Sequence, residues 1–148
     1  MKTLTKILSC LYASMLIISY TYSQQILIKQ FEKTFGGAGG ESLSGMQQTT
    51  DGGYILSGTT ASFGAGGTDV FLVKTDGTGN TEWTKTFGGT GNERVFNTGE
   101  VQQTTDGGYI VVASTNSFGA GAEDYFLIKT DPNGDTIWTK TFGGTSYD

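Results

Sequence analysis

The sequence contains no histidine and only one cysteine and one proline among its 148 residues. Without histidine the chain lacks the commonest general base and the commonest metal ligand of proteins. The single cysteine, Cys10, lies in an N-terminal stretch that we expect to be removed, so we expect neither a disulfide nor thiol chemistry in the mature chain. We therefore predict a protein that is not an enzyme, with no catalytic residue, no metal site and no cofactor.

The N-terminal stretch 1–23 has the pattern of a secretory signal peptide. Two lysines precede an apolar run at 7–18, and small residues stand three positions and one position before an expected cleavage at Gln24. An uncleaved membrane anchor is the alternative, but the run is shorter than the roughly 20 apolar residues that a spanning helix needs. A lipid-attachment site at Cys10 is disfavoured because most of the apolar run follows the cysteine. We predict a secreted or outer cell-surface protein with no stable membrane insertion after cleavage.

Positive charge is also scarce. The chain carries 9 basic and 14 acidic residues, and removal of the leader with its two lysines leaves 7 basic residues and a net charge of −7. An acidic chain is repelled by phosphate backbones and anionic lipid, so nucleic acid is not expected as a partner. Glycine, by contrast, is abundant at 24 residues without a collagen period, which indicates many tight turns.

A unit of about 55 residues occurs twice. Four segments recur at a shift of 55, namely 47–55 at 102–110, 62–66 at 117–121, 71–76 at 126–131, and 83–89 at 138–144. Residues 33–37 match 85–89 at a shift of 52, so the second copy carries three extra residues between positions 89 and 102. The predicted organisation is a signal peptide at 1–23, an orphan outer strand at 24–37, repeat units at 38–89 and 90–144, and the start of a third unit at 145–148.

Each unit has the pattern of four short antiparallel strands, predicted in the second copy at 99–105, 109–114, 125–129 and 136–142. Asp51-Gly52 and Asp106-Gly107 are hairpin turn signals, because glycine reaches positive φ without steric cost. No stretch has sustained helical periodicity. Four strands per repeat of this length are typical of a β-propeller blade. A β-solenoid would have a shorter period, and a β-sandwich would not need near-identical copies.

The aromatic residues of the fourth predicted strand recur with the repeat. They are Trp83 and Phe87 in the first unit and Trp138 and Phe142 in the second, and we predict that they pack between stacked blades. Closed rings have about four to eight blades, so two blades and one strand form an incomplete all-β ring. Further blades or other chains would have to close it. The sequence favours a fragment of a longer protein, with an assembly of several chains as the alternative.

The recurring units Gln-Gln-Thr-Thr-Asp-Gly-Gly-Tyr-Ile, Ser-Phe-Gly-Ala-Gly and Trp-Thr-Lys-Thr-Phe-Gly-Gly resemble repeats of bacterial secreted proteins of the seven-bladed β-propeller type. Such repeats are found in surface proteins exported by type IX secretion, and the resemblance covers residues 31–148. Residues 131–138 also resemble a blade pattern of quinone-dependent dehydrogenases, where it is structural. The resemblance implies a fold and an extracellular address but no single activity.

The resulting expectation is a noncatalytic structural or interaction module that binds an extracellular glycan or protein. The alternative is the N-terminal part of a carbohydrate-active propeller hydrolase whose catalytic residues lie in missing blades, and a third hypothesis is a short lectin-like ring assembled from several chains. Two carboxylate pairs could serve a glycosidase, Glu123 with Asp124 and Asp131 with Asp135. We favour a turn role for the recurring aspartates, because turn aspartates bond to their own backbone.

Two segments have partial ligand-binding patterns. Residues 131–135 carry oxygen ligands as calcium loops do, but the matching segment 76–80 has lost most of the acids and no later bidentate glutamate follows. The glycine-rich run 35–40 is not followed by a helix, as a phosphate-binding loop requires. Both segments are predicted to be plain strand-connecting loops.

Overall fold

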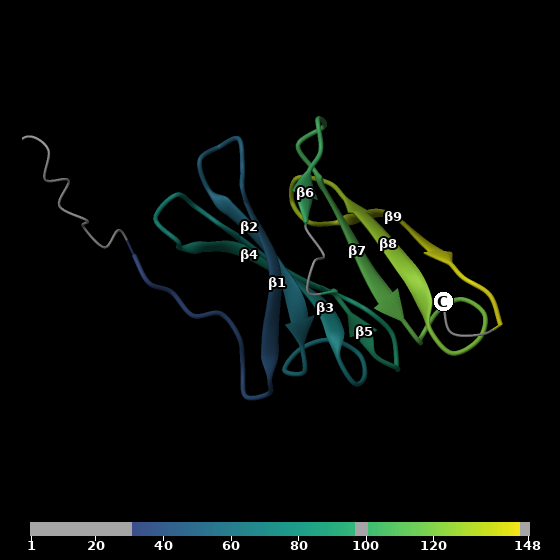
Figure 1. Cartoon of the computed structure of the whole chain (residues 1–148). Helices are drawn as coiled ribbons and strands as arrows, with labels where there is room; N and C mark the ends of the chain where they lie inside the picture. Colours follow the sequence, from purple (N-terminus) through teal and green to yellow (C-terminus); the bar gives the residue numbers. More distant parts are fainter. Residues whose placement is uncertain (1–30, 97–100, 146–148) are drawn as a thin grey trace, which may run out of the picture. The chain divides into compact units, whose positions relative to one another are not determined.

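The computed structural model describes residues 31–96 and 101–145, and within these ranges the chain is all-β. The strands form two antiparallel sheets and no helix is present in the described ranges (Figure 1). The expected all-β class is therefore confirmed. No helix in the described part of the chain is long and apolar enough to cross a membrane. The predicted signal peptide lies outside the described residues.

The first sheet contains four strands in chain order. They are β1 (Glu41–Gln48), β2 (Tyr54–Thr60), β3 (Asp69–Thr75) and β4 (Thr81–Phe87). Strand β3, with the sequence Asp-Val-Phe-Leu-Val-Lys-Thr, is buried along its whole length because it lies between β2 and β4 and is apolar on both faces. Strand β4 is only partly buried and forms an edge of the sheet.

The second sheet repeats this arrangement with a divided first strand. Its strands are β5 (Glu93–Arg94), β6 (Gln102–Gln103), β7 (Tyr109–Thr115), β8 (Asp124–Thr130) and β9 (Thr136–Phe142). Both β5 and β6 pair with β7, so together they take the place that β1 has beside β2. The last three strands match the predicted strands within one residue at each end.

The prediction of a single first strand at 99–105 is wrong. Glu93 pairs with Thr115 on β7 as Glu41 pairs with Thr60 on β2, so β5 is shifted by 52 residues from its counterpart in β1. Gln102 pairs with Ile110 as Gln47 pairs with Ile55, so β6 is shifted by 55 residues. The three extra residues therefore fall between Arg94 and Gln102, within the part of the sequence that corresponds to β1. Only 102–103 of the predicted strand is a strand in the described residues, and 99–100 lie outside them.

Residues 31–37 form no strand, although an outer strand was predicted at 24–37. Residues 24–30 of that prediction lie outside the described part. No described strand pairs with the segment 31–37. The segment nevertheless contacts the first sheet through its side chains, as described below.

One apolar core joins the two sheets. In β-strands successive side chains point to opposite faces, and alternate residues of β2 and β3 meet alternate residues of β7 and β8. The buried members of the cluster are Ile55, Val70, Leu72, Val95, Val101, Tyr109, Val111, Ala113, Phe126 and Ile128. Full burial of one aliphatic side chain of this size contributes about 1.5–3 kcal/mol, so this contact is a main source of the stability of the fold.

Candidate functional site

We name the sheet faces by their place in the repeat. The leading face of the second sheet consists of Tyr109, Val111, Ala113, Phe126 and Ile128, and its counterparts on the first sheet are Tyr54, Leu56, Gly58, Phe71 and Val73. The trailing face of the first sheet consists of Ile55, Val70, Leu72, Trp83 and Phe87, and its counterparts on the second sheet are Ile110, Tyr125, Leu127, Trp138 and Phe142. The first trailing face packs on the second leading face.

Asp51-Gly52 and Asp106-Gly107 lie in the turns that precede β2 and β7. The Oδ1 atom of Asp51 accepts a hydrogen bond of 2.9 Å from the amide of Gly53. The Oδ1 atom of Asp106 likewise accepts one of 3.0 Å from the amide of Gly108. Gly52 and Gly107 have φ of +85° and +83°, in the region that favours glycine. These aspartates hold the turns through their own backbone.

A buried lysine gives the first turn a second anchor. The Nζ atom of Lys74 lies 2.8 Å from Asp51 and 2.7 Å from Glu82, and its side chain is almost fully buried. Burial alone would lower the pKa of Lys74, but its bonds to the two carboxylates outweigh burial and raise the pKa. The same ammonium is the main reason why the pKa of Asp51 lies well below its usual range. Both charges therefore persist at neutral pH.

In the second turn the equivalent lysine pairs with the turn aspartate but has no second carboxylate. Lys129 lies 2.9 Å from Asp106, while the place of Glu82 is taken by Ile137, which is exposed. The bond from Thr104, followed by the bond from Lys129, holds the pKa of Asp106 well below its usual range. In both repeats the turn aspartate is engaged in local structure.

The acidic loops 76–80 and 131–135 bond to themselves. Oδ1 of Asp76 accepts hydrogen bonds from the amide of Asn80 at 2.9 Å and from the amide and hydroxyl of Thr78 at 2.8 Å. The Asn80 amide, followed by the Thr78 hydroxyl, lowers the pKa of Asp76 to about 2. Oδ1 of Asp131 accepts the corresponding amides of Asn133 and Asp135. No three histidine, cysteine, aspartate or glutamate side chains lie together for a metal ion in the described part of the chain.

The two carboxylate pairs that could serve glycoside hydrolysis have structural contacts. Glu123 accepts a hydrogen bond from Ser114, and Asp124 accepts one of 2.9 Å from the amide of Ala120. Asp135 forms a 2.6 Å ion pair with Lys85 of the first sheet. These acids therefore hold loops and the contact between the sheets.

Sequence reasoning missed a pair of buried carboxylates at the contact between the sheets. A Cβ atom on Gly88 would overlap both Oδ1 of Asp69 and Oε2 of Glu93, so the two acids approach the same backbone point. Burial raises the pKa of Asp69, and the charge of Glu93 adds to this rise, although the Ala65 amide opposes it. The only sign in the sequence was the recurrence of acids at both positions.

The aromatic residues of β4 are packed where the second sheet covers them. The Trp83 ring meets the Tyr109 ring edge to face at 5.6 Å, and it lies so close to Gly134 that a Cβ there would overlap it. On β9 no second described sheet covers the counterparts. Trp138 is half-buried and has the Lys140 ammonium 5.6 Å from its ring, and Phe142 is 53% exposed.

The segment 31–35 makes the same contacts with the first sheet that β4 makes with the second. The Phe31 ring meets the Tyr54 ring in a tilted contact at 5.9 Å and lies against Gly79, as the Trp83 ring lies against Tyr109 and Gly134. Lys33 donates a 3.2 Å hydrogen bond to Asn80, at the position where Lys85 pairs with Asp135. One contact geometry therefore occurs twice in the described residues.

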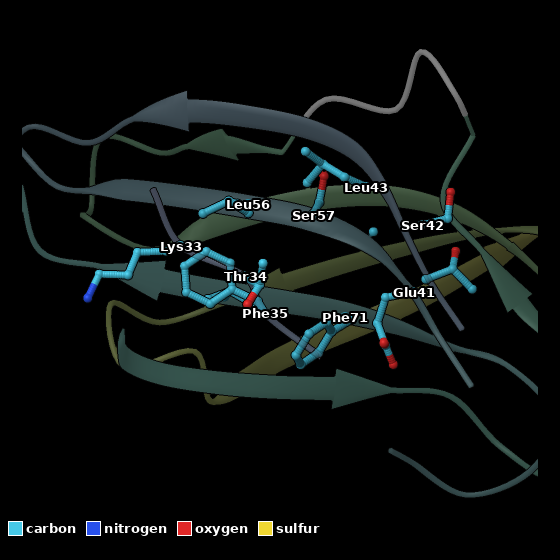
Figure 2. Close-up of a pocket in the computed structure, with 12 residues that line it drawn as sticks. Lys33, Thr34, Phe35, Glu41, Ser42, Leu43, Leu56, Ser57 and Phe71 are labelled. Carbon is cyan, nitrogen blue, oxygen red and sulfur yellow. The ribbon is translucent and has the colours of Figure 1, made fainter. Parts of the chain in front are cut away.

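An apolar cavity of about 320 Å³ lies between this segment and the first leading face. Its walls include Phe35, Leu43, Leu56, Phe71 and Val73. Figure 2 shows the Phe35 and Phe71 rings among the strands, with the ammonium of Lys33 pointing away. The corresponding residues of the second sheet are covered by the first sheet. The cavity therefore lies on the first sheet at the place where, on the second sheet, the first sheet packs.

No protein-family model matches this chain, and no curated protein matches it. The functional argument therefore depends on the geometry of the repeat and its faces.

Proposed function

We propose that the two sheets are consecutive blades of a β-propeller, and that the protein is a secreted or outer cell-surface module with a noncatalytic structural or interaction role. The proposed relatives are bacterial secreted proteins with repeats of the seven-bladed type. The observation that carries the proposal is the repeated contact between an aromatic residue of one unit and a tyrosine and glycine of the next. Radially repeated sheets of four strands that pack face to face are the propeller arrangement.

The contacts of the acids support a noncatalytic role. Asp51 and Asp106 are paired with buried lysines, and Asp76 and Asp131 accept backbone amides of their own loops. A glycosidase needs two carboxyl groups that face one bond across a substrate. The described acids instead fix turns and the contact between sheets, and such rigid turns suit loops that present a binding surface for an extracellular glycan or protein.

The test uses the exported full chain. Its N-terminus is determined by mass spectrometry, and we expect it to begin at Gln24. The purified protein is then incubated with a glycan array and with the surface proteins of the producing cell, and both retention and product formation are measured. Binding without turnover is the expected result. Hydrolysis of any retained glycan would contradict the proposed function.

A further inference from the structure

Two sheet faces of the described structure have no sheet packed on them. Of the nine large apolar side chains exposed in the described residues, five lie on or beside the first leading face or the second trailing face: Leu43, Met46, Phe96, Tyr125 and Phe142. The counterparts of Leu43 and Met46 in the second sheet are Val95 and Val101, which the contact between the sheets buries. An exposed apolar patch of this kind marks an interaction site.

We propose that the second trailing face of one copy of this chain docks on the first leading face of another copy, displacing residues 31–35. The proposal deepens the proposed function, since it takes the stacking of like sheets as the mode of assembly and names a second copy as the partner. The repeat itself specifies the occupant, because the first leading face and the second trailing face are homologues of the two faces already packed together within one chain.

Each aromatic contact of the observed interface has a counterpart in the proposed one. Trp138 of one copy would take the place of Phe31 against Tyr54 of the other, since Trp83, Trp138 and Phe31 are equivalent residues. Its ring would lie against Gly79, which is equivalent to the Gly134 that receives Trp83. Phe142 would likewise replace Phe35.

The polar contacts of the observed interface are kept as well. Gln103 donates its amide to Gln47 at 2.7 Å and accepts a 2.9 Å hydrogen bond from the amide of Thr50. Gln103 is equivalent to Gln48 beside the first leading face. Gln47 and Thr50 are equivalent to Gln102 and Thr105 beside the second trailing face, so each residue keeps its type. A docked second copy can therefore form both bonds with unchanged residues.

One polar contact of the observed interface has apolar residues at the equivalent positions of the proposed one. In the observed interface the hydroxyl of Ser44 donates a 3.1 Å hydrogen bond to the carbonyl of Val95. The residue equivalent to Ser44 is Phe96, and the residue equivalent to Val95 is Leu43, which is 64% exposed. Docking would place the Phe96 side chain where Ser44 lies, beside the backbone of Leu43, so a side-chain hydrogen bond to a carbonyl is replaced by an apolar contact.

The cavity beside residues 31–35 explains why a whole sheet can displace the segment. On the second sheet the corresponding residues are covered by Ile55, Val70 and Leu72, all fully buried. Their counterparts are Ile110, Tyr125 and Leu127, which remain partly or largely exposed. These side chains would fill the cavity of about 320 Å³ that the segment leaves open. Filling a void with apolar atoms restores dispersion contacts that its walls lack.

The two docked faces differ from each other, so the contact is heterologous. A heterologous contact continues from copy to copy until it closes a ring or forms an open filament. A ring of about four to eight blades corresponds to about two to four copies of this two-sheet chain. We expect the mass to rise with concentration and to level off within that range.

The first test is the mass of the exported full chain by sedimentation, from the micromolar to the millimolar range. We expect reversible association that Trp138→Glu weakens by about 30-fold or more, the usual effect of losing an interface anchor. Thr139→Glu is the matched control, because this neighbouring exposed residue points to the other face of β9. It should associate like the wild type.

A third variant tests displacement of the segment. Phe31→Ser removes the ring that covers Tyr54, so a larger fraction of chains has a free leading face. Apparent affinity scales with that fraction, so association should tighten. Adding Trp138→Glu to this variant should abolish the gain.

The second test fixes the register, using the absence of cysteine from the mature sequence. Lys140→Cys and Asn80→Cys, prepared as separate proteins, are mixed and treated with a short bismaleimide. Since Lys140 and Asn80 are equivalent to the paired Lys85 and Asp135, we expect a crosslinked heterodimer. Thr139→Cys mixed with Asn80→Cys should give none.

A chain that stays monomeric into the millimolar range overturns the proposal, as does association that Trp138→Glu leaves unchanged or a crosslink that forms equally from position 139. None of these results bears on glycan binding or turnover, so failure of the docking surface is distinguishable from failure of the proposed function.

Discussion

Replacing Trp83 by alanine should destabilise the chain far more than the same change at Trp138. The two residues occupy the same place in identical sequence contexts, Trp-Thr-Lys-Thr-Phe-Gly-Gly, at the centres of equivalent strands. They differ in what covers them. Trp83 meets Tyr109 and the Gly134 turn of the second sheet, whereas Trp138 has no described sheet against it. The difference between the two variants therefore isolates the contact between the sheets.

The magnitude follows from what each ring contacts, because both rings are partly buried and only Trp83 packs on the second sheet. Removing a fully buried tryptophan costs about 3–5 kcal/mol, and an edge-to-face aromatic pair contributes about 0.5–1.5 kcal/mol of such a value. Trp83 is partly buried, so we expect Trp83→Ala to cost about 2–3 kcal/mol. Trp138→Ala removes only a half-exposed ring and its contact with Lys140, so we expect less than about 1 kcal/mol.

The assay is thermal unfolding followed by circular dichroism at low micromolar concentration, where association does not cover Trp138. One kcal/mol shifts the melting temperature by about 4–8 °C in domains of 60–100 residues and about 2–4 °C in domains of 150–250 residues, so about 4 °C is expected here. Trp83→Ala should therefore lower it by about 10 °C, and Trp138→Ala by only a few degrees. Equal shifts would show that the second sheet does not cover Trp83 in solution, and would refute the stacking of the two sheets.

Three further outcomes are expected in unfolding measurements. Gly88→Ala should destabilise by about 1–3 kcal/mol because its methyl group would strike two buried carboxylates, whereas Gly40→Ala, with open space around its Cβ, should be nearly neutral. Ile137→Glu should stabilise slightly, by about 0.5 kcal/mol, because it restores to Lys129 the second carboxylate that its counterpart has. Asp76 has a folded pKa of about 2, below its unfolded value, so its stabilising contribution should be present above pH 4 and lost as the pH falls toward 2. Asp76→Ala should remove this pH dependence from the free energy of unfolding measured across the same range.

The strand pattern could be predicted because each strand carries its own local signal. The run at 109–114 is apolar on both faces and bounded by an Asp-Gly turn, and the structure places β7 at Tyr109–Thr115. The alternation at 136–142 likewise coincides with β9. Side-chain alternation and turn chemistry act over a few residues, so sequence alone is sufficient there.

The divided first strand of the second sheet could not be predicted in the same way. Its two halves keep different shifts from the first copy, 52 at Glu93 and 55 at Gln102. Glu93 gave no strand signal, because two residues cannot show alternation. Only the ladder with β7 identifies it as a strand, and that ladder is a tertiary contact.

The sequence repeat also does not predict which face of each sheet is covered. Trp83 and Trp138 are followed by the same six residues and have different environments in space, because a repeat determines the shape of each sheet but not which sheet lies against it. The sheet that covers each face is instead reflected in the positions at which the two units carry different residues. The position of Ser44 in the first unit is occupied by Phe96 in the second, and the opposing position carries Val95 in one unit and Leu43 in the other. Phe96 and Leu43 are both exposed in the single chain and would be covered when the two faces meet, which is why these residues argue for a docked sheet of the same kind.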